Sequence, residues 1–99
     1  TLATQPVFFA GDLNDSPSWN PEESAFPIIN KAFDIITPQS GTSVDQPNKT
    51  IDHVLIDKAH KGVVKVVQTA VVKQLEINGK VTETQTISDH YPVFVDVRF

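Results

Sequence analysis

Cysteine is absent from this chain of 99 residues. Its absence excludes a thiol nucleophile, a disulfide framework and any zinc site that is built on cysteine ligands. It does not assign a redox compartment, so the cellular location stays open. A chain of this length forms at most one small domain, and it buries only a modest share of its surface without further help.

Positive charge and long apolar runs are also scarce. The chain has 8 Lys and Arg against 12 Asp and Glu, without a basic cluster, which disfavours binding to a nucleic-acid backbone. No apolar run is long enough to span a bilayer, and residues 1–6 lack the pattern of a signal peptide. Because the chain starts directly ahead of a strand-like run, we expect it to be a piece cut from a longer chain.

The first third of the chain predicts one strand and one helix. Residues 7–10 are apolar and end at Gly11, which predicts a buried strand that leads into a polar loop at residues 12–17. The run Asn20-Pro21-Glu22-Glu23 combines an N-cap residue, a proline and acidic residues, which predicts a helix start. Pro27 must lie near the first turn or distort this helix. Its apolar residues are spaced three and four apart: Phe26, Ile29 and Phe33.

The middle of the chain predicts a short strand at residues 34–37, a loop at residues 38–49 and a second buried strand at residues 50–56. The loop contains Gly41, Pro47 and Asn48. In the buried strand, alternation places Ile51, His53 and Leu55 on one face and Asp52, Val54 and Ile56 on the other. Both faces are largely apolar, which is typical of a strand inside a layered structure.

The last third predicts further strands. Residues 62–77 are rich in valine and indicate one long strand or two broken ones, followed by a tight hairpin turn at Asn78-Gly79. The returning arm, residues 80–87, is polar on both faces and predicts an exposed edge. Residues 91–99 predict a final strand, with Pro92 tolerated at its start.

Three short motifs carry the candidate chemistry, each at an end of a predicted strand. Gly11-Asp12-Leu13-Asn14 places a carboxylate and an amide at the end of the first strand, where sites are usually built. By itself this motif is more often only a turn. Ser88-Asp89-His90-Tyr91-Pro92 sets a hard oxygen ligand beside an imidazole ahead of the final strand, a pairing that suits metal-assisted phosphate hydrolysis.

The third motif, Ile51-Asp52-His53, opens the second buried strand. Asp52 is a carboxylate at the edge of an apolar face, where an unpaired charge is costly. It is therefore expected either to form a salt bridge or cap with Lys49, or to fix the ring of a catalytic histidine. For His53, on the opposite face, we favour a packed and hydrogen-bonded structural role.

Together the three motifs resemble those of the endonuclease/exonuclease/phosphatase superfamily, whose C-terminal half carries a GDxN motif, an IDH or IDY strand start and an SDHxP motif in this order. The resemblance implies an α/β fold, with residues 1–99 forming the C-terminal part of a four-layer sandwich of mostly antiparallel sheets. It implies that this chain supplies mainly one sheet, whose apolar face is covered by the N-terminal portion of the domain or by a partner chain.

The resemblance also implies roles for five residues. Asp12 would orient or deprotonate the attacking water, and Asn14 would bind the nucleophile and the phosphate. Asp89 would help to bind Mg²⁺ or Mn²⁺. His90 would contact the scissile phosphate and stabilise the transition state, while Asp52 orients it. The family's upstream asparagine and glutamate, and usually a second histidine, are not found in this chain, so we expect the 99 residues alone to lack turnover and to bind metal weakly.

The substrate is less sharply indicated. The inositol-polyphosphate branch of the family is disfavoured by residues 47–52, and the abasic-site endonucleases resemble the chain less around Asp15-Ser16-Pro17. A nuclease, a sphingomyelinase-like phosphodiesterase and a hydrolase of small phosphate esters remain, and the acidic balance favours a substrate other than nucleic acid. The alternative classes are a non-catalytic β-rich binding module and a family member that lost its metal ligands and serves as a scaffold.

Overall fold

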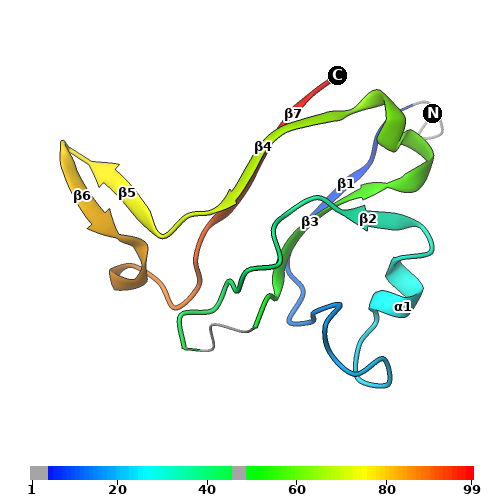
Figure 1. Cartoon of the computed structure of the whole chain (residues 1–99), viewed down its shortest axis with the longest axis horizontal. Coiled ribbons are helices and arrows are strands. Elements are labelled where there is room, and N and C mark those ends of the chain that lie inside the picture. Colours follow the sequence, from blue (N-terminus) through cyan, green and yellow to red (C-terminus); the bar gives the residue numbers. More distant parts are fainter. Residues whose placement is uncertain (1–4, 46–48) are drawn as a thin grey trace.

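The computed structural model describes residues 5–45 and 49–99 and shows a mixed α/β chain with antiparallel strands (Figure 1). Pro47 and Asn48 of the predicted loop lie outside the described residues. The strands form three small sheets with the orders β1-β3-β2, β4-β7 and β5-β6. These three sheets of the described residues do not form the four layers of a sandwich. The sandwich stays a prediction for the longer domain that the motifs imply.

The first sheet is organised around β3 (Asp52–Asp57), which pairs with β1 (Phe8–Asp12) on one side and with β2 (Phe33–Ile35) on the other. Leu55 and Ile56 point to opposite faces of β3, yet they are only 2% and 1% exposed. The prediction that this strand is covered on both faces is therefore confirmed, and the small apolar core is centred on it.

The second sheet pairs β4 (Lys65–Val71) with β7 (Val93–Arg98), and β3 contacts β7 where the two sheets meet. A 3-10 helix, η2 (Lys58–Val63), joins β3 to β4. Along β7, half-buried and exposed residues alternate, as the predicted final strand requires. The valine-rich region thus forms two broken strands, one of the two alternatives that the sequence indicated.

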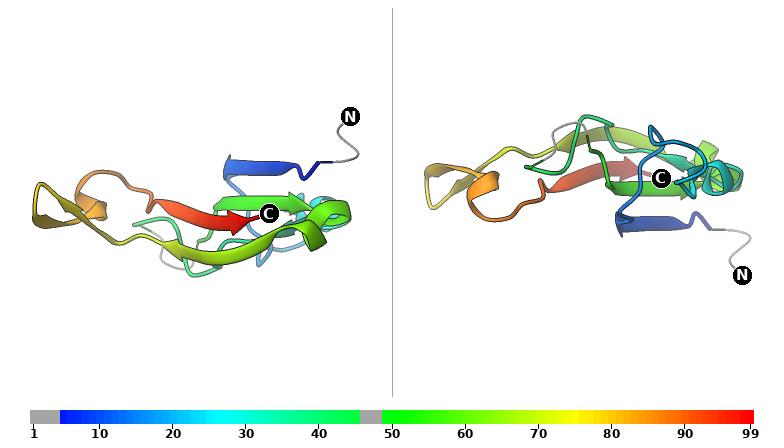
Figure 2. Two further views of the ribbon diagram at one scale, coloured as in Figure 1. Left: turned by 90° about the horizontal axis from the view of Figure 1, so that it is seen from above. Right: turned by 90° about the horizontal axis from the view of Figure 1, so that it is seen from below.

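The third sheet is a hairpin of β5 (Gln74–Ile77) and β6 (Lys80–Glu83), which projects from one end of the molecule (Figures 1 and 2). Asn78 and Gly79 both have positive φ, at 51° and 78°, which is the backbone that a tight hairpin turn needs. The predicted turn is confirmed. The returning strand ends earlier than expected, because residues 84–86 form the 3-10 helix η3 (Thr84–Thr86).

The expectation that the first strand is buried is wrong. All five residues of β1 are exposed, and Phe8 and Phe9 retain 39% and 52% of their accessible surface. The strand lies at the edge of its sheet, and the molecule measures 44 × 35 × 18 Å, so it has little depth with which to cover an edge strand. Its apolar composition indicated the strand correctly, but burial depends on neighbours that the described residues do not supply.

The predicted helix after Asn20 is also wrong in its position and length. Asn20 instead closes a turn, in which its side-chain and main-chain oxygens accept hydrogen bonds from the amides of Glu22 and Glu23. The helix α1 is a single turn, Phe26–Ile29, with Pro27 in its first turn as the sequence required. A helix running on from residue 21 would force the Pro27 ring against the carbonyl four residues earlier. Phe33, expected on this helix, lies in β2.

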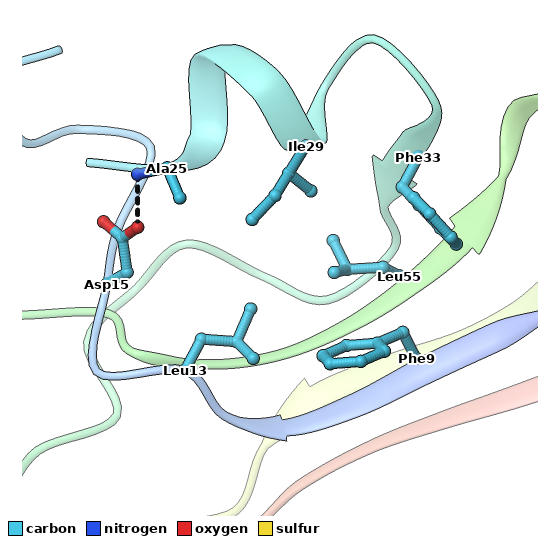
Figure 3. A pocket seen from close by; sticks show the side chains of 7 residues that line it. All are labelled: Phe9, Leu13, Asp15, Ala25, Ile29, Phe33 and Leu55. Carbon is cyan, nitrogen blue, oxygen red and sulfur yellow. Dashed lines mark hydrogen bonds between the residues drawn. The ribbon is translucent and has the colours of Figure 1, made fainter.

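Helix α1 packs over one face of the first sheet and leaves an open hollow of about 270 Å³ between helix and sheet (Figure 3). Apolar side chains line nearly all of it: Phe9, Leu13, Ala25, Ile29, Phe33 and Leu55. Its polar member, Asp15, uses its carboxylate to accept hydrogen bonds from the amides of Ser16 and Ala25. Within the described residues, no helix has the length and apolar character needed to cross a membrane.

Candidate active site

The candidate site begins where the end of β1 meets the start of β3. The antiparallel register places Asp12 directly opposite Asp52, so two carboxylates from distant parts of the sequence become cross-strand neighbours. Like charges in directly opposed positions destabilise a sheet unless a cation lies between or beside them. The side chain of Asp52 is 15% exposed and that of Asp12 is 48% exposed, so the pair spans the edge of a partly buried site.

His90 supplies the positive partner. An isolated bridge pairs His90 with Ser43, which lies in the loop between β2 and β3. Its ring Nδ1 lies 2.8 Å from Asp52 Oδ2, and its Nε2 lies 3.8 Å from Asp12 Oδ2. A carboxylate can only accept here, so Nδ1–H donates to Asp52. This arrangement directs Nε2 toward Asp12 at a separation longer than a hydrogen bond.

The acidic surroundings favour the charged form of His90. The hydrogen bond with Asp52 is the largest cause that raises the pKa of His90 above its ordinary value. Partial burial opposes this shift, and the charges of Asp52, Asp12 and Asp89 add to it. The site can thus present an imidazolium whose Nε2–H faces the carboxylate of Asp12.

The backbone around Asp12 determines how its carboxylate is presented. Gly11 has φ of 149°, a conformation that residues with a Cβ rarely adopt, which explains glycine at the start of this motif. The amide of Asn14 donates to Asp12 Oδ1 at 2.8 Å, with Asn14 itself at φ of 49°. One carboxylate oxygen is therefore held by the loop, and Oδ2 is the oxygen that faces His90.

Thr42 braces the site from behind, although no motif or periodic pattern singles it out. It is fully buried, and its hydroxyl accepts hydrogen bonds from the amides of Ile51 and Asp52 at 3.0 and 3.2 Å. Its carbonyl accepts the amide of Tyr91 at 2.7 Å. Thr42 thus fixes the start of β3 through its side chain and the residue after His90 through its main chain.

Three side chains of the site form a candidate donor set for a divalent cation. Asp12, Asp52 and His90 each offer one ligand atom, and these atoms all lie within 4.8 Å of one another. Two carboxylates suit Mg²⁺ and Mn²⁺, and Mn²⁺ also accepts imidazole, so the residues fit such an ion. Because Asp52 is engaged by His90, Asp12 Oδ2 is the better available ligand. Asp89, the expected metal ligand, is exposed and lies outside this group of three.

The partner of Asp52 and the role of His53 are both defined by the structure. Asp52 binds His90, whereas the Nζ of Lys49 lies 5.7 Å from the centroid of the Trp19 ring, so the salt bridge considered for Asp52 is not formed. His53 points to the other face, as expected, and is 1% exposed. Its Nε2–H donates to the Asp15 carbonyl and its ring packs edge-on against Phe26, which confirms a packed structural histidine.

The acidic pair opens onto a shallow hollow of about 310 Å³. Its lining comes from the ends of three strands and the segment ahead of β7: Ala10, Gly11, Asp12, Asp52, His53, Val54, Tyr91, Pro92 and Val93. The hollow therefore combines carboxylates on one side with an aromatic and apolar wall on the other, a composition suited to a small polar ligand.

Comparisons with known proteins give no independent assignment. No family model matches the chain, and no match is found among curated proteins or among solved structures. The likeness to the endonuclease/exonuclease/phosphatase superfamily therefore depends on the three motifs alone. The geometry of Asp12, Asp52 and His90 is an independent observation that any functional proposal for this chain has to explain.

Proposed function

We propose that this chain carries one wall of the active site of a divalent-metal-dependent phosphoesterase. The observation that carries the proposal is the arrangement of Asp52, His90 and Asp12, in which one carboxylate orients the imidazole and the other faces its Nε2. A structural ion pair would not need the second carboxylate, which is half exposed and costs repulsion against Asp52. Functional sites tolerate such unfavourable placements.

In the proposed reaction, a water oxygen bonds to phosphorus while the ester bond breaks. The leaving oxygen takes up a proton from solvent, so the products are an alcohol and a phosphate. Asp12 orients the attacking water, whose proton passes to solvent, and the Nε2–H of His90 donates to a phosphate oxygen as negative charge develops there. Asp52 keeps the His90 ring in the orientation and tautomer that this requires. Asn14 contributes a hydrogen bond to the nucleophile or phosphate.

Asp12 and Asp89 are the residues proposed to hold Mg²⁺ or Mn²⁺. Such an ion would supply Lewis-acid stabilisation of the charged phosphate oxygens. The proposed unit of activity is a longer domain, in which an N-terminal portion contributes the remaining metal ligands and covers the exposed apolar faces. The 99 residues alone are expected to show no turnover, and Mg²⁺-dependent phosphodiesterase activity from them would contradict this division of the site.

A paramagnetic titration tests the metal-site proposal without requiring turnover. Adding MnCl₂ to the isotopically labelled chain should broaden the NMR signals of Asp12 and His90 first, and Asp12→Asn should weaken this effect. His60, which is bonded to Asp57 at the far end of β3, is the internal control. Equal broadening of His60 and His90, or no difference between wild type and the Asp12 variant, would count against the proposal.

A further inference from the structure

Lys73 lies next to the candidate site although no motif includes it. The register of β4 and β7 ends with Val71 opposite Val93, and the amide of Val72 donates to the carbonyl of Pro92 at 2.8 Å. Continuing this antiparallel pairing by one step brings Lys73 opposite Tyr91. Because side chains alternate along a strand, Lys73 and Tyr91 lie on the same face as Val71 and Val93.

Two residues of that face border the hollow. Tyr91 and Val93 line the hollow together with Asp12 and Asp52. The Nζ of Lys73 lies 5.4 Å from the centroid of the Tyr91 ring, within the range of a cation–π contact. The ammonium group is therefore held against a wall of the hollow, while the residue stays exposed to solvent and to a ligand.

The backbone of Lys73 is tied to the segment that carries His90. Thr84 is 2% exposed, its amide donates to the Lys73 carbonyl at 3.0 Å, and its hydroxyl donates to the Val72 carbonyl at 2.8 Å. The Thr84 carbonyl in turn accepts the amides of Ile87 and Ser88. Lys73 and the loop before His90 thus share one buried anchor, which limits how far they can move apart.

The acidic charges around the hollow explain why the Lys73 ammonium matters for binding an anionic ligand. Asp12, Asp52 and Asp89 all act on His90, so a phosphate that binds at this imidazole lies in the field of three carboxylates, two of which line the hollow. A ligand with a single phosphate charge can be served by His90 and a metal. A ligand with a further negative group needs another cation at the edge of the site, or repulsion excludes it.

We propose that Lys73 is a specificity-determining residue, which binds an anionic group of the substrate beyond the phosphate that is hydrolysed. The preferred substrates are then phosphate esters with a second phosphate or comparable anion. This inference rests on the proposed function, since it assigns the phosphate that is hydrolysed to the Asp52, His90 and Asp12 cluster. Tyr91 serves as the platform that keeps the Lys73 ammonium in place.

Binding of pyrophosphate and of inorganic phosphate to the metal-free chain tests the inference. An exposed ion pair contributes about 0.2–1 kcal/mol, so Lys73→Gln should weaken pyrophosphate binding by up to about fivefold and phosphate binding by clearly less. Lys73→Arg should restore most of the pyrophosphate affinity. Lys80→Gln, in the turn-proximal part of the hairpin, removes an equal charge away from Tyr91 and should leave both affinities close to wild type.

The outcomes separate this inference from the proposed function. Equal losses in the two glutamine variants, equal losses for the two ligands, or no pyrophosphate binding by the wild type would each overturn the role of Lys73. If Mn²⁺ acts selectively on His90 but Lys73→Gln has no effect, only this inference fails. If pyrophosphate binding depends on Lys73 but Mn²⁺ leaves Asp12 and His90 unchanged, the metal-dependent function fails and the anion site stands.

Discussion

Strand β3 begins and ends with an aspartate, and each of these aspartates is bonded to a histidine. Asp52 accepts a hydrogen bond from His90 Nδ1 at the start of the strand, and Asp57 accepts one from His60 Nδ1 at its end. The two pairs have the same chemical groups and the same ring nitrogen. They therefore offer a comparison, within one molecule, between a pair that we assign to chemistry and a pair that serves the fold.

The surroundings of the two pairs differ. Asp57 and His60 are three residues apart with side chains 16% and 17% exposed, and the second oxygen of Asp57 accepts the Val7 amide, which ties down the start of β1. His90 is 33% exposed and 38 residues from Asp52, and its second nitrogen faces another carboxylate. An Asp–His pair alone thus indicates little. Access and a second acidic group distinguish the candidate site.

Replacing Thr42 should have the largest effect on stability. It should disturb the Asp52–His90 pair and leave the Asp57–His60 pair intact. Thr42→Val leaves the buried amide of Ile51 and the part-buried amide of Asp52 without their acceptor, at a cost of about 1–3 kcal/mol for a fully buried group and less for a part-buried one. We expect a loss of about 2–4 kcal/mol in the free energy of unfolding, measured by urea denaturation. NMR should show shifted signals for His90 with those of His60 nearly unchanged.

Thr42→Ser keeps the hydroxyl and serves as the matched control. It should retain most of the stability and the wild-type signals of His90, because the two amide acceptors are preserved. Thr42→Val retains a methyl group, so if it loses little stability while Thr42→Ser loses more, the methyl group of Thr42 and not its hydroxyl holds the site together, and the bracing role assigned here is wrong.

Gly11→Ala should have the next largest effect. At φ of 149° a Cβ strains the backbone whatever the space around it, and no neighbouring atom lies within 4 Å of the added carbon. The expected cost is about 1–3 kcal/mol, together with weaker Mn²⁺ broadening at Asp12. Gly62→Ala is the control, because that position also has open space but no such φ. Equal costs at the two positions would exclude strain at Gly11 as the cause.

Much of the fold could be predicted from local pattern. The β3 strand, the Asn78-Gly79 hairpin and the last strand each follow from alternation or turn chemistry within a few residues, and the structure has all three. The three motifs directed attention to the strand ends where Asp12, Asp52 and His90 meet. These features could be predicted because each motif is contiguous in the sequence and can be recognised without knowledge of distant contacts.

The remaining features depend on distant contacts. Burial of β1 was overestimated because an apolar run shows what a strand can bury and not what covers it. Thr42 was missed because a threonine in a loop looks the same whether its hydroxyl meets solvent or two buried amides. The resemblance implies a metal ligand at Asp89, whereas the group of Asp12, Asp52 and His90 depends on where each side chain points in space.

A pH titration of His90 sharpens the comparison further. The hydrogen bond with Asp52 is the first cause that raises the pKa of His90, so Asp52→Asn should lower that pKa toward its ordinary value of 6.5. A raised pKa means that the pair stabilises the fold fully below 6.5 and loses this contribution as pH rises through the folded value. Asp57→Asn, at the other pair, should leave the NMR titration of His90 unchanged.

The smallest expected effect is the acid dependence set by Asp57. The Val7 amide, followed by His60, holds the pKa of Asp57 below its ordinary value of 3.8. A lowered pKa gives stability that is fully present above 3.8 and is lost as pH falls through the folded value. Wild type and Asp57→Asn should therefore differ in melting temperature at neutral pH and converge in acid, without any change in Mn²⁺ broadening at His90. A change at His90 would show that the two pairs are coupled through β3, and the division between a structural and a chemical pair would have to be abandoned.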